Sequence, residues 1–184
     1  MRLYHTGFDV IREPDVHHGR KNADLGQGFY MTRDLAFAER WGMFRKGLQT
    51  VVNEYELDLS GLTVHTFDRD EAWLDYLAGN RGGKKDTLDA DVVIGPIAND
   101  TIYDTLGIMT SGFLGKAEAL KLLKLGPQYE QIVLKTEKAA AQLKFVSSKV
   151  LEEAFLQENA RRIRAEEEAY QKACAGEMES WVDA

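Results

Sequence analysis

The chain has 184 residues, a formal net charge of -7, 44% hydrophobic residues and 10% aromatic residues. This length is enough for one domain with a core and an appendage, and the composition is typical of a globular protein. The acidic balance disfavours nucleic acid as the main partner, because nucleic-acid binders usually present a basic face, whereas a local pocket for one diphosphate needs only a few Arg or Lys side chains.

The expected compartment follows from the apolar runs and the cysteine count. No run approaches the roughly 18 to 20 apolar residues that cross a bilayer, so no membrane partner is expected. Residues 1–6 lack the apolar stretch of a signal peptide and are typical of a first strand. The single Cys174 cannot form an internal disulfide, which favours a reducing compartment. We therefore expect a cytoplasmic protein, and leaderless secretion as an effector is compatible with the same sequence.

The first third of the chain predicts short strands separated by loops. Residues 2–6 and 29–32 are typical of short strands, and a polar, glycine-containing loop over residues 7–27 separates them. Apolar residues at helical spacing predict a helix over residues 34–42. Alternation of apolar and polar residues then predicts a half-buried strand over residues 50–59.

A helix is predicted to open at Asp68, because Asp68 and Glu71 fit the spacing of a capping box. Trp73, Leu74 and Leu77 then form its apolar stripe. The elements expected after it are a Gly- and Lys-rich loop, a buried strand, two helices and two strands. In order they cover residues 81–89, 91–97, 100–106, 116–125, 131–135 and 143–146.

The C-terminal part predicts one long charged helix from Ser148 to about Ala175, with Ser147 and Ser148 as its cap. A helix that is polar on nearly all sides is exposed or packed on a partner. We therefore divide the chain into a domain over residues 1–147 and a charged helical extension over residues 148–184, which is a possible partner-binding element. The short, irregularly alternating strands and helices predict an α+β fold with a compact, mostly antiparallel sheet core.

Two segments near the N-terminus have residue types suited to ligand binding. His5 lies in the first strand and is followed by Thr6 and Gly7, and a glycine there allows the backbone to approach a ligand closely. Gly28 precedes a short aromatic strand in which Tyr30 offers a flat ring for stacking on a cationic ring such as nicotinamide. Taken alone, each segment is equally compatible with an ordinary strand and turn.

Two later segments place polar residues beside apolar strands. Asn99 or Asp100 follows a strand that ends at a Gly-Pro pair, where either residue is a natural helix cap or a residue at the rim of a pocket. Glu130 and Gln131 stand at the start of the strand over residues 131–135 and can hydrogen-bond a ribose. No metal is expected, since adjacent histidines such as His17 and His18 rarely face one ion and no third ligand lies at a known spacing.

Taken in order, these motifs resemble an uncharacterised bacterial family, a domain of unknown function, in the ADP-ribosyltransferase-like superfamily. The resemblance extends from residue 2 to about residue 146. The matching segments are Leu3-Tyr4-His5, Gly19-Arg20, Asp24 through Thr32, Asn80-Arg81 after Trp73-Leu74, Asp91 through Asp100, and Gln131-Ile132 leading to Thr136-Glu137-Lys138-Ala139.

The resemblance implies a split, mostly antiparallel sheet core that binds NAD, as in the His-Tyr-Glu branch of the superfamily. In that branch the strand histidine, here His5, hydrogen-bonds the adenosine ribose. The backbone of the next residue, here Thr6 or Gly7, holds the nicotinamide amide. A tyrosine, here Tyr30, stacks on the nicotinamide.

The branch also has a glutamate that orients the nicotinamide ribose, and Gln131 occupies that position here. Gln131 can hydrogen-bond a hydroxyl but adds no charge beside a developing cation. Glu130 is the alternative, but neighbouring side chains on a strand point to opposite faces, so only one of the two can face the ribose. Arg20 or Arg81 can meet the diphosphate, and each is equally suited to a surface ion pair.

The sequence therefore predicts a mono-ADP-ribosyltransferase, a glycosyltransferase that moves ADP-ribose from NAD to an unknown macromolecular acceptor, as a toxin, an effector or a regulator. Loss of the glutamate favours transfer of a single unit. The alternatives are a non-catalytic NAD- or nucleotide-binding module, which the neutral Gln131 favours, and an interaction adaptor that uses the C-terminal helix.

Overall fold

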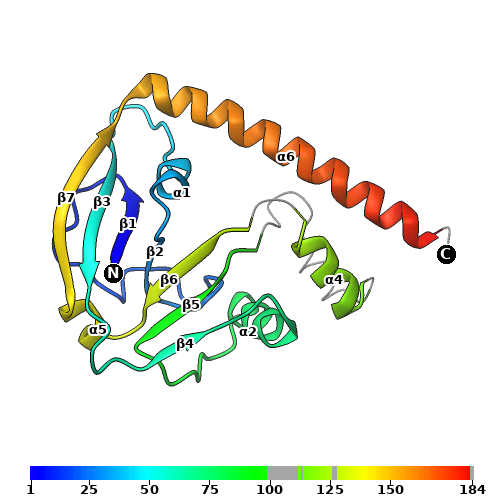
Figure 1. Cartoon of the computed structure of the whole chain (residues 1–184), viewed down its shortest axis with the longest axis horizontal. Coiled ribbons are helices and arrows are strands. Elements are labelled where there is room, and N and C mark those ends of the chain that lie inside the picture. The colour runs from blue at the N-terminus through cyan, green and yellow to red at the C-terminus, as the bar shows by residue number, and fades with distance from the viewer. Residues whose placement is uncertain (99–111, 113, 126–127, 183–184) are drawn as a thin grey trace.

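The computed structural model describes residues 1–98, 112, 114–125 and 128–182 of the chain. It has an α+β fold with two sheets and a long C-terminal helix, which confirms the predicted α+β class (Figure 1). Among the described residues, no helix is both long enough and apolar enough to cross a membrane. The predicted helix over residues 100–106 lies outside the described residues, as do Asn99 and Asp100.

The first sheet has three antiparallel strands in the order β1 (Arg2–Gly7), β3 (Thr50–Leu57) and β7 (Leu143–Leu151). Its inward side chains alternate along each strand, as in Leu3, Tyr55 and Leu57. They pack against one face of the second sheet and form the larger hydrophobic core.

The second sheet has four strands in the order β2 (Phe29–Met31), β6 (Glu130–Leu134), β5 (Val92–Pro96) and β4 (Val64–Thr66). The pairs β2–β6 and β5–β6 are antiparallel, whereas β4 and β5 are parallel and α2 (Glu71–Arg81) connects them. The sequence did not predict β4, because its three residues show no buried alternation.

The second sheet is buried on both faces. One face packs on the first sheet, and the other is covered by α2 and α4 (Lys116–Leu123), which contribute Trp73, Leu77 and Leu123 to a second core. Figure 1 shows α2 and α4 on the side of this sheet away from β1, β3 and β7. The apolar stripe predicted for α2 is therefore its core face.

Besides their packed side chains, the two sheets are joined, within the described residues, by one backbone bridge between Tyr4 and Thr32. The amide of Tyr4 donates to the carbonyl of Thr32 at 2.8 Å, and the amide of Thr32 donates to the carbonyl of Tyr4 at 3.0 Å. This pair of bonds places β1 against β2, although 25 residues separate His5 from Tyr30.

Helix caps explain where the shorter helices begin. The carboxylate of Asp34 accepts from the amide of Phe37 and caps α1 (Leu35–Arg40). The N-cap of α2 is Asp70, so the prediction that this helix opens at Asp68 was wrong. The chain first extends alongside β5, where the Phe67 amide donates to the Ile94 carbonyl. Because of this pairing, the N-cap lies two residues later than predicted. The sequence did not predict α5 (Glu137–Ala141), a single short turn.

The boundary between the sheet core and the C-terminal helix differs from the prediction. β7 continues to Leu151 and α6 spans Glu153–Val182, so Ser147 and Ser148 are strand residues and not a helix cap. The boundary drawn between residues 147 and 148 thus falls inside a strand. The physical reason is the length of β3, whose eight residues offer backbone partners as far as Leu151. The exposed side chains of β7 give no strand alternation in the sequence.

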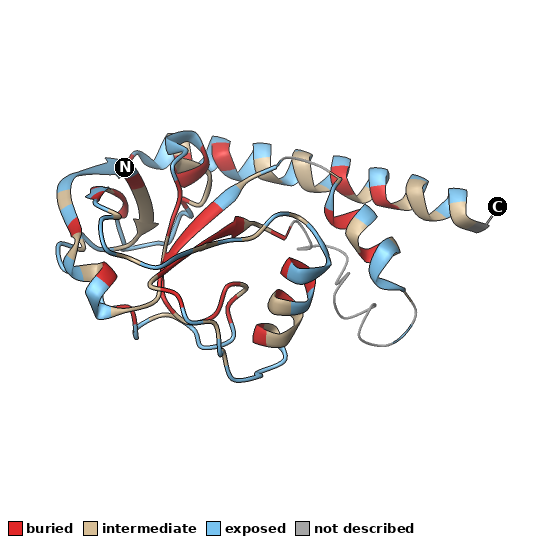
Figure 2. Cartoon of the chain, turned by 60° about the horizontal axis from the view of Figure 1, so that its bottom comes forward, coloured by how far each residue is buried: buried red, intermediate tan, exposed pale blue. Residues whose placement is uncertain are grey.

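The helix α6 packs on its own chain at two places. Near its start, Leu156 is buried against Ala38, Val52 and Leu151. Further along, the hydroxyl of Tyr170 donates to the carbonyl of Leu122 in α4. Buried positions recur along α6, which passes from the end of β7 to α4 (Figures 1 and 2).

Polar contacts also join the first part of α6 to α1. The side-chain amide of Asn159 donates to the carbonyls of Glu39, Arg40 and Gly42 at 3.0 to 3.3 Å, at the C-terminal end of α1. Arg40 also forms an ion pair with Glu166 at 2.5 Å. Asn159 therefore adds a donor for carbonyls at the end of α1 and just after it, where helix carbonyls lack intrahelical partners.

Replacing Asn159→Ala should lower the free energy of unfolding by about 1–3 kcal/mol, because the buried carbonyls at the end of α1 would lose their donor. Urea denaturation followed by circular dichroism measures this change. The matched control is Gln157→Ala on the exposed side of the same helix, which should change the value little. Equal losses in both variants would contradict the capping role of Asn159.

Acid should weaken the fold through Asp91. Hydrogen bonds from the Thr63 amide, Lys138 and Thr136 lower the pKa of this carboxyl from 3.8 to about 2. A carboxyl with a lowered folded-state pKa stabilises the fold above its unfolded pKa, and this stability is lost as the pH falls through the folded value. The urea midpoint should therefore fall between pH 4 and pH 2, with a smaller fall in Asp91→Asn. Asp89→Asn, at an exposed neighbour, should retain the wild-type profile.

Candidate functional site

His5 lies beside the bridge between the sheets. Its Nδ1 is 2.8 Å from the carbonyl oxygen of Tyr30, and its ring lies 4.4 Å from that of Phe29. A carbonyl only accepts, so Nδ1 donates the hydrogen. Burial lowers the pKa of His5, although the bond to Tyr30 acts in the opposite direction, so the ring is neutral near pH 7. Its Nε2 is therefore a hydrogen-bond acceptor.

The two residues after His5 leave room beside that nitrogen. The hydroxyl of Thr6 donates to the carbonyl of Ala38 at 2.5 Å, which ties β1 to α1. Gly7 continues the pairing with β3. A Cβ atom at Gly7 would lie 3.3 Å from the Nε2 of His5, so a side chain there would crowd the acceptor. The glycine thus keeps Nε2 approachable.

Tyr30 is anchored by its hydroxyl. That hydroxyl donates to the carbonyl of Gly26 at 2.6 Å and accepts from the amide of Leu25 at 3.0 Å. Burial raises the pKa of Tyr30 above its ordinary value, so the phenol stays protonated and neutral. Gly28 is required just before the strand, because a Cβ atom there would lie 2.5 Å from the Leu134 carbonyl.

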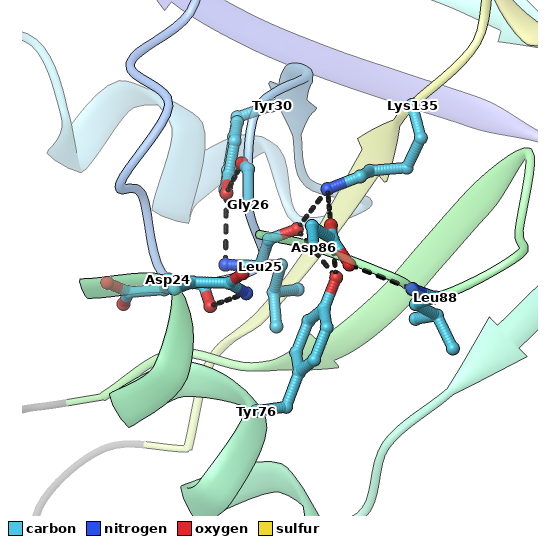
Figure 3. A network of polar contacts seen from close by, with 9 residues as sticks. Asp24, Leu25, Gly26, Tyr30, Tyr76, Asp86, Leu88 and Lys135 are labelled. Carbon is cyan, nitrogen blue, oxygen red and sulfur yellow. Dashed lines mark hydrogen bonds and ion pairs between the residues drawn. The ribbon is translucent and has the colours of Figure 1, made fainter. Parts of the chain in front are cut away.

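The carbonyl of Leu25 belongs to a polar network that holds the loop before Tyr30 (Figure 3). The carbonyl of Leu25 accepts from the ammonium of Lys135 at 2.6 Å. Lys135 is also paired with Asp86 at 2.7 Å, and the hydroxyl of Tyr76 donates to the same carboxylate oxygen at 2.8 Å. The second oxygen of Asp86 accepts from the Leu88 amide at 3.0 Å.

The charge state of this network is well defined. Burial raises the pKa of the Asp86 carboxyl, but hydrogen bonds from Lys135, the Leu88 amide and Tyr76 outweigh burial, and the net pKa is lowered. Asp86 is therefore ionised at neutral pH and balances the charge of Lys135. The sequence contains no local signal for Lys135, Asp86 or Tyr76, because these partners are 10 and 49 positions apart.

The two candidates for the ribose-binding residue, Glu130 and Gln131, point to opposite faces of β6. Glu130 is exposed and lies 3.6 Å from Arg33 in an ion pair. Gln131 is only 5% exposed and shares a sheet face with Tyr30, because Tyr30 pairs with Val133, two residues along the same strand. No residue that the structure describes offers a hydrogen-bond partner to the Nε2 of Gln131. A buried amide donor without a partner is costly, so we treat Gln131 as a candidate ligand contact.

The other predicted binding residues are not gathered at one place. Arg81 forms an ion pair with Asp24 at 2.8 Å and so supports the loop before Tyr30. Arg20 is exposed, and its charge lies near enough to Tyr30 to act, more weakly than burial, on the pKa of that phenol. Asn99 and Asp100 lie outside the described residues. The described part of the chain contains no cluster of His, Cys, Asp or Glu placed to hold a metal ion.

The comparison with protein families covers most of the two-sheet core. Residues 1–145 match the family described as "Protein of unknown function (DUF3990)". The chain belongs to this family. The match ends within β7, so α6 lies beyond it. No curated protein and no solved structure matches the chain. Membership of a family of unknown function agrees with the sequence motifs.

Replacing Tyr30→Phe should lower the free energy of unfolding by about 1–3 kcal/mol, because the Leu25 amide and the Gly26 carbonyl would lose their partner. Urea denaturation measures the loss. Tyr4→Phe is the control, since the hydroxyl of Tyr4 has no hydrogen-bond partner among the described residues. If the two variants unfold alike, the hydroxyl of Tyr30 is not an anchor.

Proposed function

We propose that this chain is an ADP-ribosyltransferase-like protein that transfers a single ADP-ribose unit from NAD to a macromolecular acceptor. The observation that supports this most directly is the buried amide nitrogen of Gln131, on the sheet face of Tyr30, which no described residue hydrogen-bonds. The link between His5 and the carbonyl of Tyr30 adds a second support, because it joins the two other residues that the family resemblance assigns to NAD.

His5 and Gln131 each offer a group that suits a ribose hydroxyl, and the resemblance assigns them to the two different riboses of NAD. A ribose hydroxyl can donate to the Nε2 of His5, which is held as an acceptor. The Nε2 of Gln131 can donate to the oxygen of another hydroxyl. The partly buried ring of Tyr30 offers a flat surface to the cationic nicotinamide.

In the proposed reaction the bond between C1′ of the ribose and the nicotinamide nitrogen breaks, and its electron pair leaves with nicotinamide. An acceptor nucleophile supplies an electron pair to C1′ and loses a proton. The leaving group is already cationic in NAD, so the protein mainly has to orient the two rings and exclude water. Gln131 orients the ribose but adds no charge beside the developing cation, so we expect slow transfer of single units.

The alternative is a module of the same fold that binds NAD without consuming it. The observation that favours it is again Gln131, whose neutral amide satisfies a ribose hydroxyl without stabilising an oxocarbenium ion. The two proposals share the binding groups and differ only in turnover.

Release of nicotinamide from labelled NAD, with transfer of label to candidate acceptors, distinguishes them. Gln131→Ala should lower the rate of release by roughly 10- to 100-fold, and Gln131→Glu should raise it by adding a carboxylate. Glu130→Gln is the matched control on the exposed side of the same strand and should leave the rate unchanged. NAD binding without release in every variant would establish the binding module. No binding of NAD in a folded protein would overturn both proposals.

A further inference from the structure

A cavity of about 570 Å³ is lined in part by Gln27, Asp86 and Lys135, and Tyr30 is not among its lining residues. It is bounded by the loop after β1, by the loop between α2 and β5, and by the end of β6. Its volume falls in the range of small-molecule sites. Nothing in the proposed transfer chemistry assigns a role to it.

The wall of this cavity is basic, whereas the whole chain has a net charge of -7. Four lysines and two aspartates contribute to the wall, which leaves an excess of two positive charges. They are Lys21, Lys84, Lys85, Lys135, Asp86 and Asp89. Within the described part of the chain, Lys21, Lys84 and Lys85 form no ion pair. Such a gathering of free ammonium groups favours an anionic ligand.

Lys135 gives the cavity a buried donor. Its side chain is only 10% exposed, and its ammonium has three hydrogens. One is taken by the carbonyl of Leu25 and one by the carboxylate of Asp86. The third has no partner among the residues that the structure describes, and Lys135 lines the cavity.

We propose that this cavity binds the phosphate groups of a small ligand, a diphosphate or a similar anion, with Lys135 at its floor and Lys84 and Lys85 at its rim. The site is coupled to Tyr30, because Lys135 holds the carbonyl of the same Leu25 whose amide bonds to the Tyr30 hydroxyl (Figure 3). The loop is packed closely on this pair, since a side chain at Gly26 would collide with both Lys135 and Asp86.

The test is a titration of the full chain with inorganic pyrophosphate by isothermal calorimetry at low ionic strength. The wild type should bind it, and the double variant Lys84→Gln with Lys85→Gln should bind it at least about tenfold more weakly. Both lysines are exposed, so the fold is retained. The matched control is Lys46→Gln with Lys144→Gln, which removes two exposed lysines that do not line this cavity. No binding by the wild type, or equal weakening in both double variants, would overturn the proposal.

A competition experiment identifies the source of the phosphates. If pyrophosphate displaces NAD, the cavity receives the diphosphate of NAD; if both bind together, it receives a separate phosphorylated ligand, and either result supports the site. Pyrophosphate binding without NAD binding would overturn the proposed function but would support phosphate binding in the cavity. NAD turnover without pyrophosphate binding would overturn the proposal that the cavity binds phosphate groups but would support the proposed function.

Discussion

The bridge between Tyr4 and Thr32 is the constraint on which the candidate site depends. It is a single pair of backbone hydrogen bonds, and it joins a three-stranded sheet to a four-stranded sheet. Because it aligns β1 with β2, the residue after Tyr4 meets the strand that contains Tyr30, and the His5 bond to the Tyr30 carbonyl follows. That bond in turn sets the tautomer of His5 and leaves its Nε2 as an acceptor.

The loop that precedes Tyr30 is held by the ion pair of Lys135 with Asp86. The ion pair of Lys135 with Asp86 is largely buried. The desolvation cost of burying two charges can exceed the Coulombic attraction between them. Here the cost is offset by additional hydrogen bonds from Tyr76 and the Leu88 amide and by the carbonyl of Leu25. The result is a loop in which both polar backbone groups of Leu25 are engaged, so the Tyr30 ring has one defined position. A flat ring held in this way is suited to stacking because little ordering entropy remains to be lost on binding.

The C-terminal helix belongs to the architecture and is not a free appendage. It contacts α1 through Leu156 and Asn159 and contacts α4 through Tyr170. These contacts use one side of α6, while charged residues occupy much of the remainder. The family match ends before α6, whereas α1 and α4, which the helix contacts, lie within the matched residues.

Residue patterning alone placed the segments that contain the candidate residues. Short apolar runs predicted β1, β2, β5 and β6, and the helical stripe with Trp73 predicted α2, whereas the family resemblance assigned roles to His5, Tyr30 and Gln131. Local sequence could not predict β4 or the last residues of β7, because their exposed side chains have no alternation and only their neighbours in the sheet define them. Nor could it show that Gln131 faces inward and Glu130 outward, that Arg81 is committed to Asp24, or that Lys135 meets Asp86. Each of these depends on strand register or on a contact between distant residues, and tertiary packing alone decides such relations.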